Sequence, residues 1–242
     1  MTIARRFAVA LAEVTDPALA GPELLPVRLT RACTRTLAVD GAGLSMAGAA
    51  EQRLPLGASS EEAELAERLQ FTVGSGPCMT AEETGQPVFA VEDELRRRWP
   101  AYTEQLVGST PFHAVVALPL RPGLAGAGAI DLYFRHSTRV PDLDVFDALA
   151  VGEMVTSALG DAAVWSVWAP GEGPEWLHGP TPQRRAAVWE VIGALGVELG
   201  LSAPTALALL RAHAHGAART VDDIAAELLS GRLRTADLQP GR

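Results

Sequence analysis

The chain has 242 residues, of which 48% are hydrophobic and 20% charged, an ordinary composition for a soluble globular protein of one or two domains. Its formal net charge is −9, and all 20 basic residues are arginine. The C-terminal part, 183–242, holds 7 Arg against 6 Asp or Glu, so it is the only part that does not repel a polyanion overall.

The cysteines and the N-terminus bear on location. Cys33 and Cys78 form no metal-ligand pattern and are expected as free thiols in a reduced cytoplasm. The apolar run Phe7–Ala12 follows two arginines but is too short for a signal peptide. No stretch reaches the about 18 apolar residues of a membrane span. We therefore expect a cytoplasmic protein outside any membrane.

The first part of the chain is expected to mix helices with short strands. Apolar residues at helical spacing predict an amphipathic helix within residues 1–20. After two proline breaks, the pattern predicts a helix over 24–37, strands over 42–47 and 53–56, and a helix over 59–70.

The middle of the chain begins with a Gly-rich loop and a short helix between Pro77 and Gly85. There follow a strand over 88–91, a charged stretch over 92–99, a hairpin of strands 112–120 and 128–135, and a long helix from 142 to about 168. Hairpins without strict strand–helix alternation indicate an α+β domain over 21–168, built on an antiparallel sheet with flanking helices.

Residues 169–182 are the best candidate for a linker, because they are rich in proline and glycine. Three tryptophans lie in or beside this segment, at Trp165, Trp168 and Trp176. A free linker rarely carries so many large aromatic side chains, so we expect the segment to be docked against the protein.

Residues 183–236 are predicted to form a small bundle of three helices. Val188, Val191 and Leu195 fit one apolar stripe of the first helix. Ser202 can cap the second helix, and Thr220 with Asp223 forms an acidic variant of the capping box before the third.

The spacing within this tail resembles that of a known family. Gly193 stands late in the first helix, Gly200-Leu201-Ser202 precedes the second, Ala206 is followed by Leu210-Arg211, and Ile224-Ala225 lies in the third. In these positions the tail resembles the ANTAR domain, a three-helix RNA-binding module of bacterial transcription antitermination regulators. The resemblance covers about residues 184–235 and implies that the tail binds an RNA hairpin.

The upstream domain resembles a GAF domain, a PAS-like fold that binds small molecules. The resemblance lies in the loop Gly74–Met79, in Glu83–Val88, and in the predicted sheet hairpin. It implies a sensor for a small molecule or a protein partner, and a homodimer whose long helix transmits the signal to the tail.

The ANTAR-like resemblance also implies which residues meet RNA. The candidate contacts are Arg184, Arg185, Glu190, Gly193, Arg211, His213, Arg219, Arg232 and Arg234. Arginines release counterions from RNA phosphates. The family pattern has glutamine where this chain has Glu190, so one negative charge stands on the expected RNA side.

A ligand pocket is expected within the GAF-like domain. Its candidate residues are Phe71, Cys78, Phe112, His113, Leu118, Asp131 and Tyr133. Asp131 and Tyr133 alternate along one strand and so share a face. Cys78 has two interpretations, a redox-active thiol or a buried inert one.

No catalytic constellation, phosphate-binding loop or metal-ligand spacing stands out, so we expect no catalytic residue, metal or cofactor. The first hypothesis is an antitermination regulator. The alternative, motivated by Glu190 and the near-neutral tail, is a ligand-sensing or protein-interaction dimer whose tail no longer binds RNA. A sulfoxide reductase is a third hypothesis, and it requires a reactive Cys78.

Overall fold

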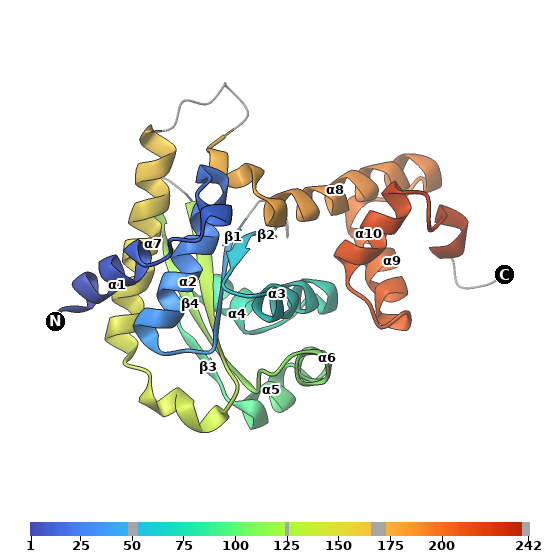
Figure 1. Ribbon diagram of the computed structural model, residues 1–242. Coiled ribbons are helices and arrows are strands. Elements are labelled where there is room, and N and C mark those ends of the chain that lie inside the picture. The colour runs from blue at the N-terminus through green and yellow to red at the C-terminus, as the bar shows by residue number, and fades with distance from the viewer. Residues whose placement is uncertain (48–52, 124–125, 166–172, 239–242) are drawn as a thin grey trace.

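The computed structural model describes residues 1–47, 53–123, 126–165 and 173–238. Within them, an α+β domain occupies the N-terminal part and a group of helices projects from one side of it (Figure 1). This division agrees with the α+β fold and the helical tail predicted from the sequence.

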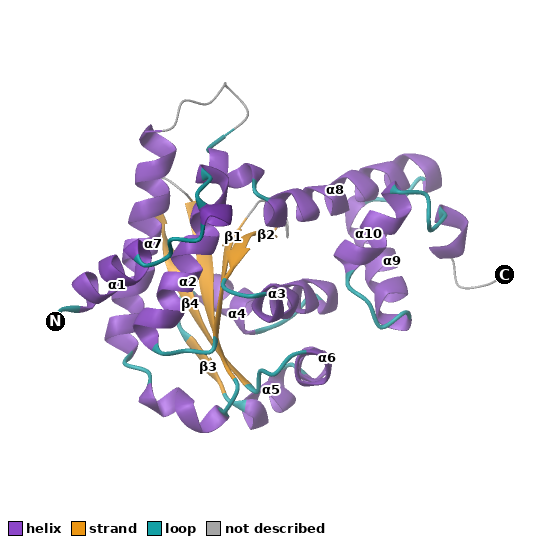
Figure 2. Ribbon diagram, viewed as in Figure 1, coloured by secondary structure: helices purple, strands orange, loops and turns teal. Residues whose placement is uncertain are grey.

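One five-stranded sheet forms the centre of the α+β domain, and its hydrogen-bonded neighbours are all antiparallel (Figure 2). The order across the sheet is β2-β1-β5-β4-β3. The strands are β1 (Gly41–Ala47), β2 (Arg53–Ala58), β3 (Val88–Ala90), β4 (Ala114–Gly123) and β5 (Gly126–Phe134). The predicted hairpin is confirmed, because β4 pairs with β5.

Helices cover both faces of this sheet (Figure 2). On one face lie α1 (Ile3–Ala12), α2 (Leu25–Leu37) and α7 (Val145–Trp165). On the other face lie α3 (Glu61–Val73), α4 (Pro77–Thr84), α5 (Glu92–Arg98) and α6 (Pro100–Ser109). Helix α6 was not predicted from the sequence, because its apolar and polar residues are not separated onto different faces.

Side chains of β5 alternate between the two faces, as the pleat requires. Ile130 and Leu132 belong to the apolar core beneath α1, α2 and α7. Ala129 and Tyr133 belong to the second core, beneath the other helices, and Asp131 lies between them on the same face. The sheet therefore separates a mainly apolar side from a side that contains buried charged groups.

The N-terminal helix is part of the α+β domain rather than an appendage. Its buried residues Phe7 and Ala10 join the first apolar core, and the helix packs against α2 and α7. The helix begins after Thr2, whose hydroxyl accepts the backbone N–H of Arg5 at 3.4 Å. Burial of this apolar stripe is the physical reason for the amphipathic pattern.

The tail consists of α8 (Pro180–Leu199), α9 (Ala203–Gly216) and α10 (Val221–Leu229). Its own apolar core includes Val188, Leu210 and Ile224. The predicted caps are confirmed: Ser202 Oγ accepts the N–H of Thr205, and Thr220 and Asp223 form the reciprocal capping box. Helices of this length gain stability from such caps and from the shared core.

The predicted linker is partly structured. A short 3-10 helix, η4 (Glu175–His178), occupies its middle, and α8 already starts at Pro180. Trp176 is buried in the first apolar core, as the docking argument expects, whereas Trp165 is 83% exposed. Trp168 lies outside the described residues.

Among the described helices, none is by itself long and apolar enough to cross a membrane. The pair α8 and α9 meets the length and composition criterion only jointly, with a bend of 108° between them.

Candidate functional site

Ionisable and polar side chains gather inside the α+β domain, on the sheet face covered by α3, α4 and α6. Nine side chains from the sheet and these three helices form this group, which we call the buried polar cluster. Its members are Ser45, Arg53, Glu67, Gln70, Cys78, Glu82, Tyr102, Asp131 and Tyr133. Every member except Glu82 is buried, and buried ionisable groups are unusual unless they are paired or functional.

The Gly-rich loop positions Cys78 within this cluster. Gly74 ends α3 in the left-handed conformation, with φ of 80°, which favours glycine. A side chain at Gly76 would collide with Gln70, whose Oε1 accepts the backbone N–H of Cys78 at 3.0 Å. The two glycines therefore let the chain turn tightly between α3 and α4 and bring the thiol beneath the sheet.

Arg53 is the centre of the cluster. Its guanidinium donates to the hydroxyl of Ser45, to the sulfur of Cys78 and to the carboxylate of Glu82. Its Nε also lies 3.9 Å from Glu67 Oε1. Burial alone would lower the pKa of Arg53, but Cys78, Glu82 and the other nearby acids outweigh it and raise that pKa, so the guanidinium stays charged.

The pKa values of the acids in the cluster are raised as well, which for an acid disfavours the charged form. Burial raises the pKa of Glu67, Glu82 and Asp131 above the ordinary range, although Arg53 opposes the shift in each case. Burial also raises the pKa of the Cys78 thiol well above its usual value. The thiol is therefore neutral, which disfavours nucleophilic chemistry.

Several cluster atoms are buried without a hydrogen-bond partner among the described residues. They are Arg53 Nε, Glu67 Oε1, Glu82 Oε1, Tyr102 Oη and Asp131 Oδ1. Each buried polar atom without a partner lowers the stability of the fold, so a group of such atoms indicates a functional gain that offsets the loss. Four of the five can accept a hydrogen bond.

The tail reaches this cluster through one side chain. Arg185 on α8 is fully buried. Its Nη2 donates to Glu67 Oε2 at 3.1 Å, its Nε to Asp222 Oδ1 at 3.1 Å, and its Nη1 to the backbone oxygen of Arg53 at 3.1 Å. The guanidinium also stacks over the Phe71 ring, 3.5 Å from its centroid.

Helix α3 also contacts the tail. Arg68 Nη1 pairs with Asp223 Oδ1 at 3.0 Å, and Thr72 Oγ1 accepts the N–H of Val221 at 3.0 Å. Arg184 pairs with Glu64. The tail is therefore held on the α+β domain by ion pairs and hydrogen bonds as well as by apolar packing.

The structure divides the predicted RNA contacts into two groups. Arg184, Arg185 and Arg211 face the α+β domain, where Arg211 Nε donates to the backbone oxygen of Phe71 at 3.2 Å. The prediction for Arg185 requires correction: a guanidinium with no exposed surface cannot reach a phosphate in this conformation.

The other predicted contacts lie on the outside of the tail. Arg219 pairs with Glu227 at 2.6 Å and Arg234 with Asp237 at 3.0 Å. The remaining residues of this group are exposed or, for His213, half-buried: Glu190, Gly193, His213 and Arg232.

The predicted ligand pocket is also divided. Phe112, Cys78, Asp131 and Tyr133 do lie together, and the Phe112 and Tyr133 rings stack at a centroid distance of 5.0 Å. Leu118 does not belong with them, because strand alternation places it in the core on the opposite face.

Two further pocket predictions are corrected by the structure. Phe71 packs into the core of the tail, where its ring meets Trp189 edge-on at 6.1 Å. His113 lies directly before the first residue of β4 and lines a separate cleft.

Sequence reasoning missed most of the charged members of the cluster. Arg53, Glu67 and Glu82 looked like ordinary surface charges. Two signals were available. Arg53 stands at the start of an otherwise apolar strand, and Glu67 and Gln70 are three residues apart on α3, so they lie on one side of that helix. Among the described residues, no group of three or more His, Cys, Asp or Glu side chains is placed to hold a metal ion.

No protein-family model matches the chain, and no curated protein matches it. Solved structures do match. The GAF domain of a phosphoenolpyruvate-protein phosphotransferase from Coxiella burnetii is 14% identical, with a TM-score of 0.47, over 67% of this chain and 98% of that one. A domain assigned to a two-component sensor histidine kinase of Sinorhizobium meliloti 1021 is 17% identical, with a TM-score of 0.45, over 58% and 92%.

A third similar structure is the free methionine-R-sulfoxide reductase of Neisseria meningitidis. It is 16% identical, with a TM-score of 0.38, over 66% of this chain and 90% of that one. The five-stranded antiparallel sheet with its flanking helices agrees with the α+β fold expected from the sequence. At these identities and TM-scores the likenesses assign no role to any residue.

Proposed function

We propose that this chain is a signal-responsive regulator in which the α+β domain receives a small-molecule or partner signal and the ANTAR-like tail binds an RNA hairpin to prevent transcription termination. The observation that carries the proposal is the burial of Arg185 between the two parts. One side chain of the tail touches Glu67, a member of the buried polar cluster, at 3.1 Å.

This contact gives the signal a physical route. A ligand that bonds to Glu67, or changes its protonation, alters the strength of the hold on Arg185. A ligand shifts such an equilibrium by its difference in affinity for the held and released tail. The structure described above then corresponds to the held state.

The RNA surface of the proposal is the outer face of the tail. Arg219 is partly exposed and Arg234 is exposed, and both pair with acids of the tail itself; Arg232 is exposed as well. Exposed ion pairs contribute little to stability, so RNA phosphates can replace the acids at small cost. Release of the tail would add Arg184 and Arg211 to this surface.

The test is RNA binding by the full chain and by Glu67→Gln. This substitution removes the acidic partner of Arg185 on the α+β domain but leaves Asp222, its acidic partner within the tail. We expect labelled stem-loop RNAs to bind Glu67→Gln more tightly than the parent, with an affinity that falls as salt rises. Glu61→Gln, an exposed position on the same helix, is the control and should behave as the parent.

The second candidate function is a ligand-sensing or protein-interaction dimer whose tail does not bind RNA. It is favoured by the occupation of Arg184, Arg185 and Arg211 in contacts with the α+β domain, and by the exposed Glu190. If no stem-loop binds either the parent or Glu67→Gln at 50 mM salt, the RNA proposal fails. Binding that appears only in Glu190→Gln would place the loss at that position.

A homodimer is part of both candidates. Phe146 and Val164 are 79% and 57% exposed on α7, and their spacing of five full turns puts them on one side of the helix. Leu149 is 37% exposed and lies one turn from Phe146, so it extends the same stripe. Sedimentation of Phe146→Ser would test this, since it should shift the chain toward a monomer.

We propose a regulator rather than an enzyme, acting without a cofactor in the cytoplasm. Support comes from Cys78, whose burial and raised pKa are the reverse of what a reactive thiol needs. Both cysteines are free, which suits a reducing compartment.

A further inference from the structure

A second group of ionisable side chains lies at the end of the sheet, away from the buried polar cluster. His113 comes directly before β4 and Arg135 directly after β5. The paired strands hold them close together, because the N–H of His113 donates to the backbone oxygen of Phe134 at 2.8 Å. From Arg135 the chain continues into the 3-10 helix η3 (Ser137–Asp142).

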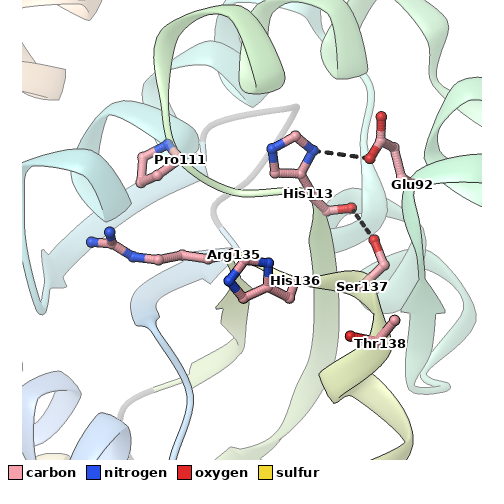
Figure 3. Close-up of a pocket in the computed structure, with 7 residues that line it drawn as sticks. All are labelled: Glu92, Pro111, His113, Arg135, His136, Ser137 and Thr138. Atoms are coloured by element: carbon pink, nitrogen blue, oxygen red, sulfur yellow. Dashed lines mark hydrogen bonds and ion pairs between the residues drawn. The ribbon is translucent and has the colours of Figure 1, made fainter.

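These residues surround an open cleft of about 560 Å³ (Figure 3). It is lined by Glu92, Pro111, His113, Arg135, His136, Ser137 and Thr138. Clefts that bind small molecules range from roughly 300 to 1,000 Å³, so the space suits a small organic ligand. We call it the sheet-end cleft.

One wall of the sheet-end cleft is fixed by hydrogen bonds. Glu92 Oε2 lies 2.9 Å from His113 Nδ1 (Figure 3). The other oxygen of Glu92 accepts a hydrogen bond from Arg96. The hydroxyl of Ser137 donates to the backbone oxygen of His113 at 3.0 Å. The single acid of the cleft is therefore already paired, and the imidazole it contacts is held in place.

The other wall offers a cation. The backbone N–H of Arg135 donates to Asp40 Oδ2 at 2.9 Å, which anchors the main chain. In the described part of the chain, the guanidinium of Arg135 makes no ion pair or side-chain hydrogen bond, and the residue is exposed. Glu62 is the acid that it influences: the pKa of Glu62 is lowered chiefly by its own backbone N–H, then by Ser60, and least by Arg135.

We propose that the sheet-end cleft binds a small phosphate-bearing molecule, with Arg135 as the principal contact. An arginine fork donates two parallel hydrogen bonds to phosphate oxygens. His113, His136 and the hydroxyl of Thr138 supply further donors from two separate chain segments, which suits a tetrahedral group more than a planar one. This site depends neither on RNA binding nor on the buried polar cluster.

The experiment is a titration of inorganic phosphate into the full chain at constant ionic strength, followed by backbone amide NMR shifts. We expect saturable binding, with shifts concentrated at residues 112–113 and 135–138. Arg135→Gln should weaken binding by about tenfold or more, as expected for loss of a charge-assisted pair. The same spectra show whether the variant remains folded.

Arg139→Gln is the matched control. Arg139 is an exposed neighbour that lies outside the cleft lining and pairs with Asp142 at 3.7 Å. Its replacement removes the same charge and should leave phosphate binding unchanged. Equal weakening in both variants, or no saturation in the parent, would overturn the proposal. Acetate binding as tightly as phosphate would show that the cleft does not select phosphate and that the phosphate assignment is wrong.

Discussion

The two faces of one sheet are stabilised in different ways. Along β5, Leu132 points into a core of apolar side chains, while its neighbour Asp131 points into the buried polar cluster. Both residues are buried, 0% and 2% exposed. The apolar face contributes stability by area alone, whereas the charged face holds groups that burial penalises.

The difference indicates which face has a function beyond folding. A domain needs one well-packed core to fold, and the face under α1, α2 and α7 supplies it. The charged face instead carries unpaired polar atoms and the attachment of the tail. Stability that is given up in this way usually marks a site.

The largest effect is expected at Arg185, where the two parts of the molecule meet. Arg185→Ala leaves Glu67 and Asp222 buried without their partner, and breaking a buried pair in this way costs about 3–5 kcal/mol. Urea unfolding would measure the loss, and hydrogen exchange would show it centred on α3 and α10.

Its neighbour supplies the control. Arg184 pairs with Glu64, but its side chain is 40% exposed, so solvent screens the interaction. Arg184→Ala should cost less than about 1 kcal/mol. Equal costs for the two variants would mean that Arg185 is not the residue that holds the tail.

A smaller but still substantial loss is expected on the apolar face. Leu132→Ala removes buried methyl groups from the first core and should lower the unfolding free energy by about 2–5 kcal/mol. The adjacent Asp131→Asn should cost far less, since it keeps the side-chain volume and removes a buried charge. If Asp131→Asn lowers the free energy of unfolding as much as Leu132→Ala, the two faces do not differ in how they stabilise the fold.

Much of the fold could be predicted from the sequence because local chemistry specifies it. Pro77 and Gly85 bound α4 as expected, and Thr220 with Asp223 marks the start of α10. Alternation placed Asp131 and Tyr133 on one face. These features depend on residues only a few positions apart, so they can be predicted from a single sequence.

The candidate site could be predicted only in part, because its contacts join distant segments. Arg185 meets Glu67 across 118 residues and Asp222 across 37. An arginine on an amphipathic helix is normally solvated, and the residues next to Arg185 in the sequence do not indicate that it is buried. Leu118 was misplaced for a simpler reason: the strand was identified without assigning which of its alternating residues shared a face with Asp131.

The pH dependence of stability should separate the two faces further. The pKa values of Glu67, Glu82 and Asp131 are higher in the folded than in the unfolded chain. The contribution of these acids to folding stability is therefore fully present below the unfolded pKa and is lost as pH rises through the folded pKa. Asp131→Asn removes one of these carboxylates. Its unfolding free energy should therefore fall less steeply than that of the parent as pH rises above 3.8, the ordinary pKa of Asp131.

The control for this measurement is an exposed acid of the tail. The pKa of Asp237 is lowered, mainly by a hydrogen bond from Arg234, so its stabilising contribution is lost only as pH falls. Asp237→Asn should change the free energy of unfolding at acid pH and leave it unchanged near neutral pH. An unchanged pH dependence near neutral pH in Asp131→Asn would show that this carboxylate is not strained by burial.

The smallest effect is expected at the two cysteines, one on each face. Cys33 belongs to the apolar core and Cys78 to the buried polar cluster, and both are 0% exposed. Burial raises the pKa of both thiols, and the positive charge of Arg53 opposes this only at Cys78. We expect iodoacetamide to label neither thiol in the native chain and both in denaturant. Fast labelling of Cys78 alone would show that the charge of Arg53 outweighs burial and produces a thiolate, in support of the enzymatic hypothesis. Equal resistance of the two thiols would mean that the charged face binds a ligand or transmits a signal without covalent chemistry at sulfur.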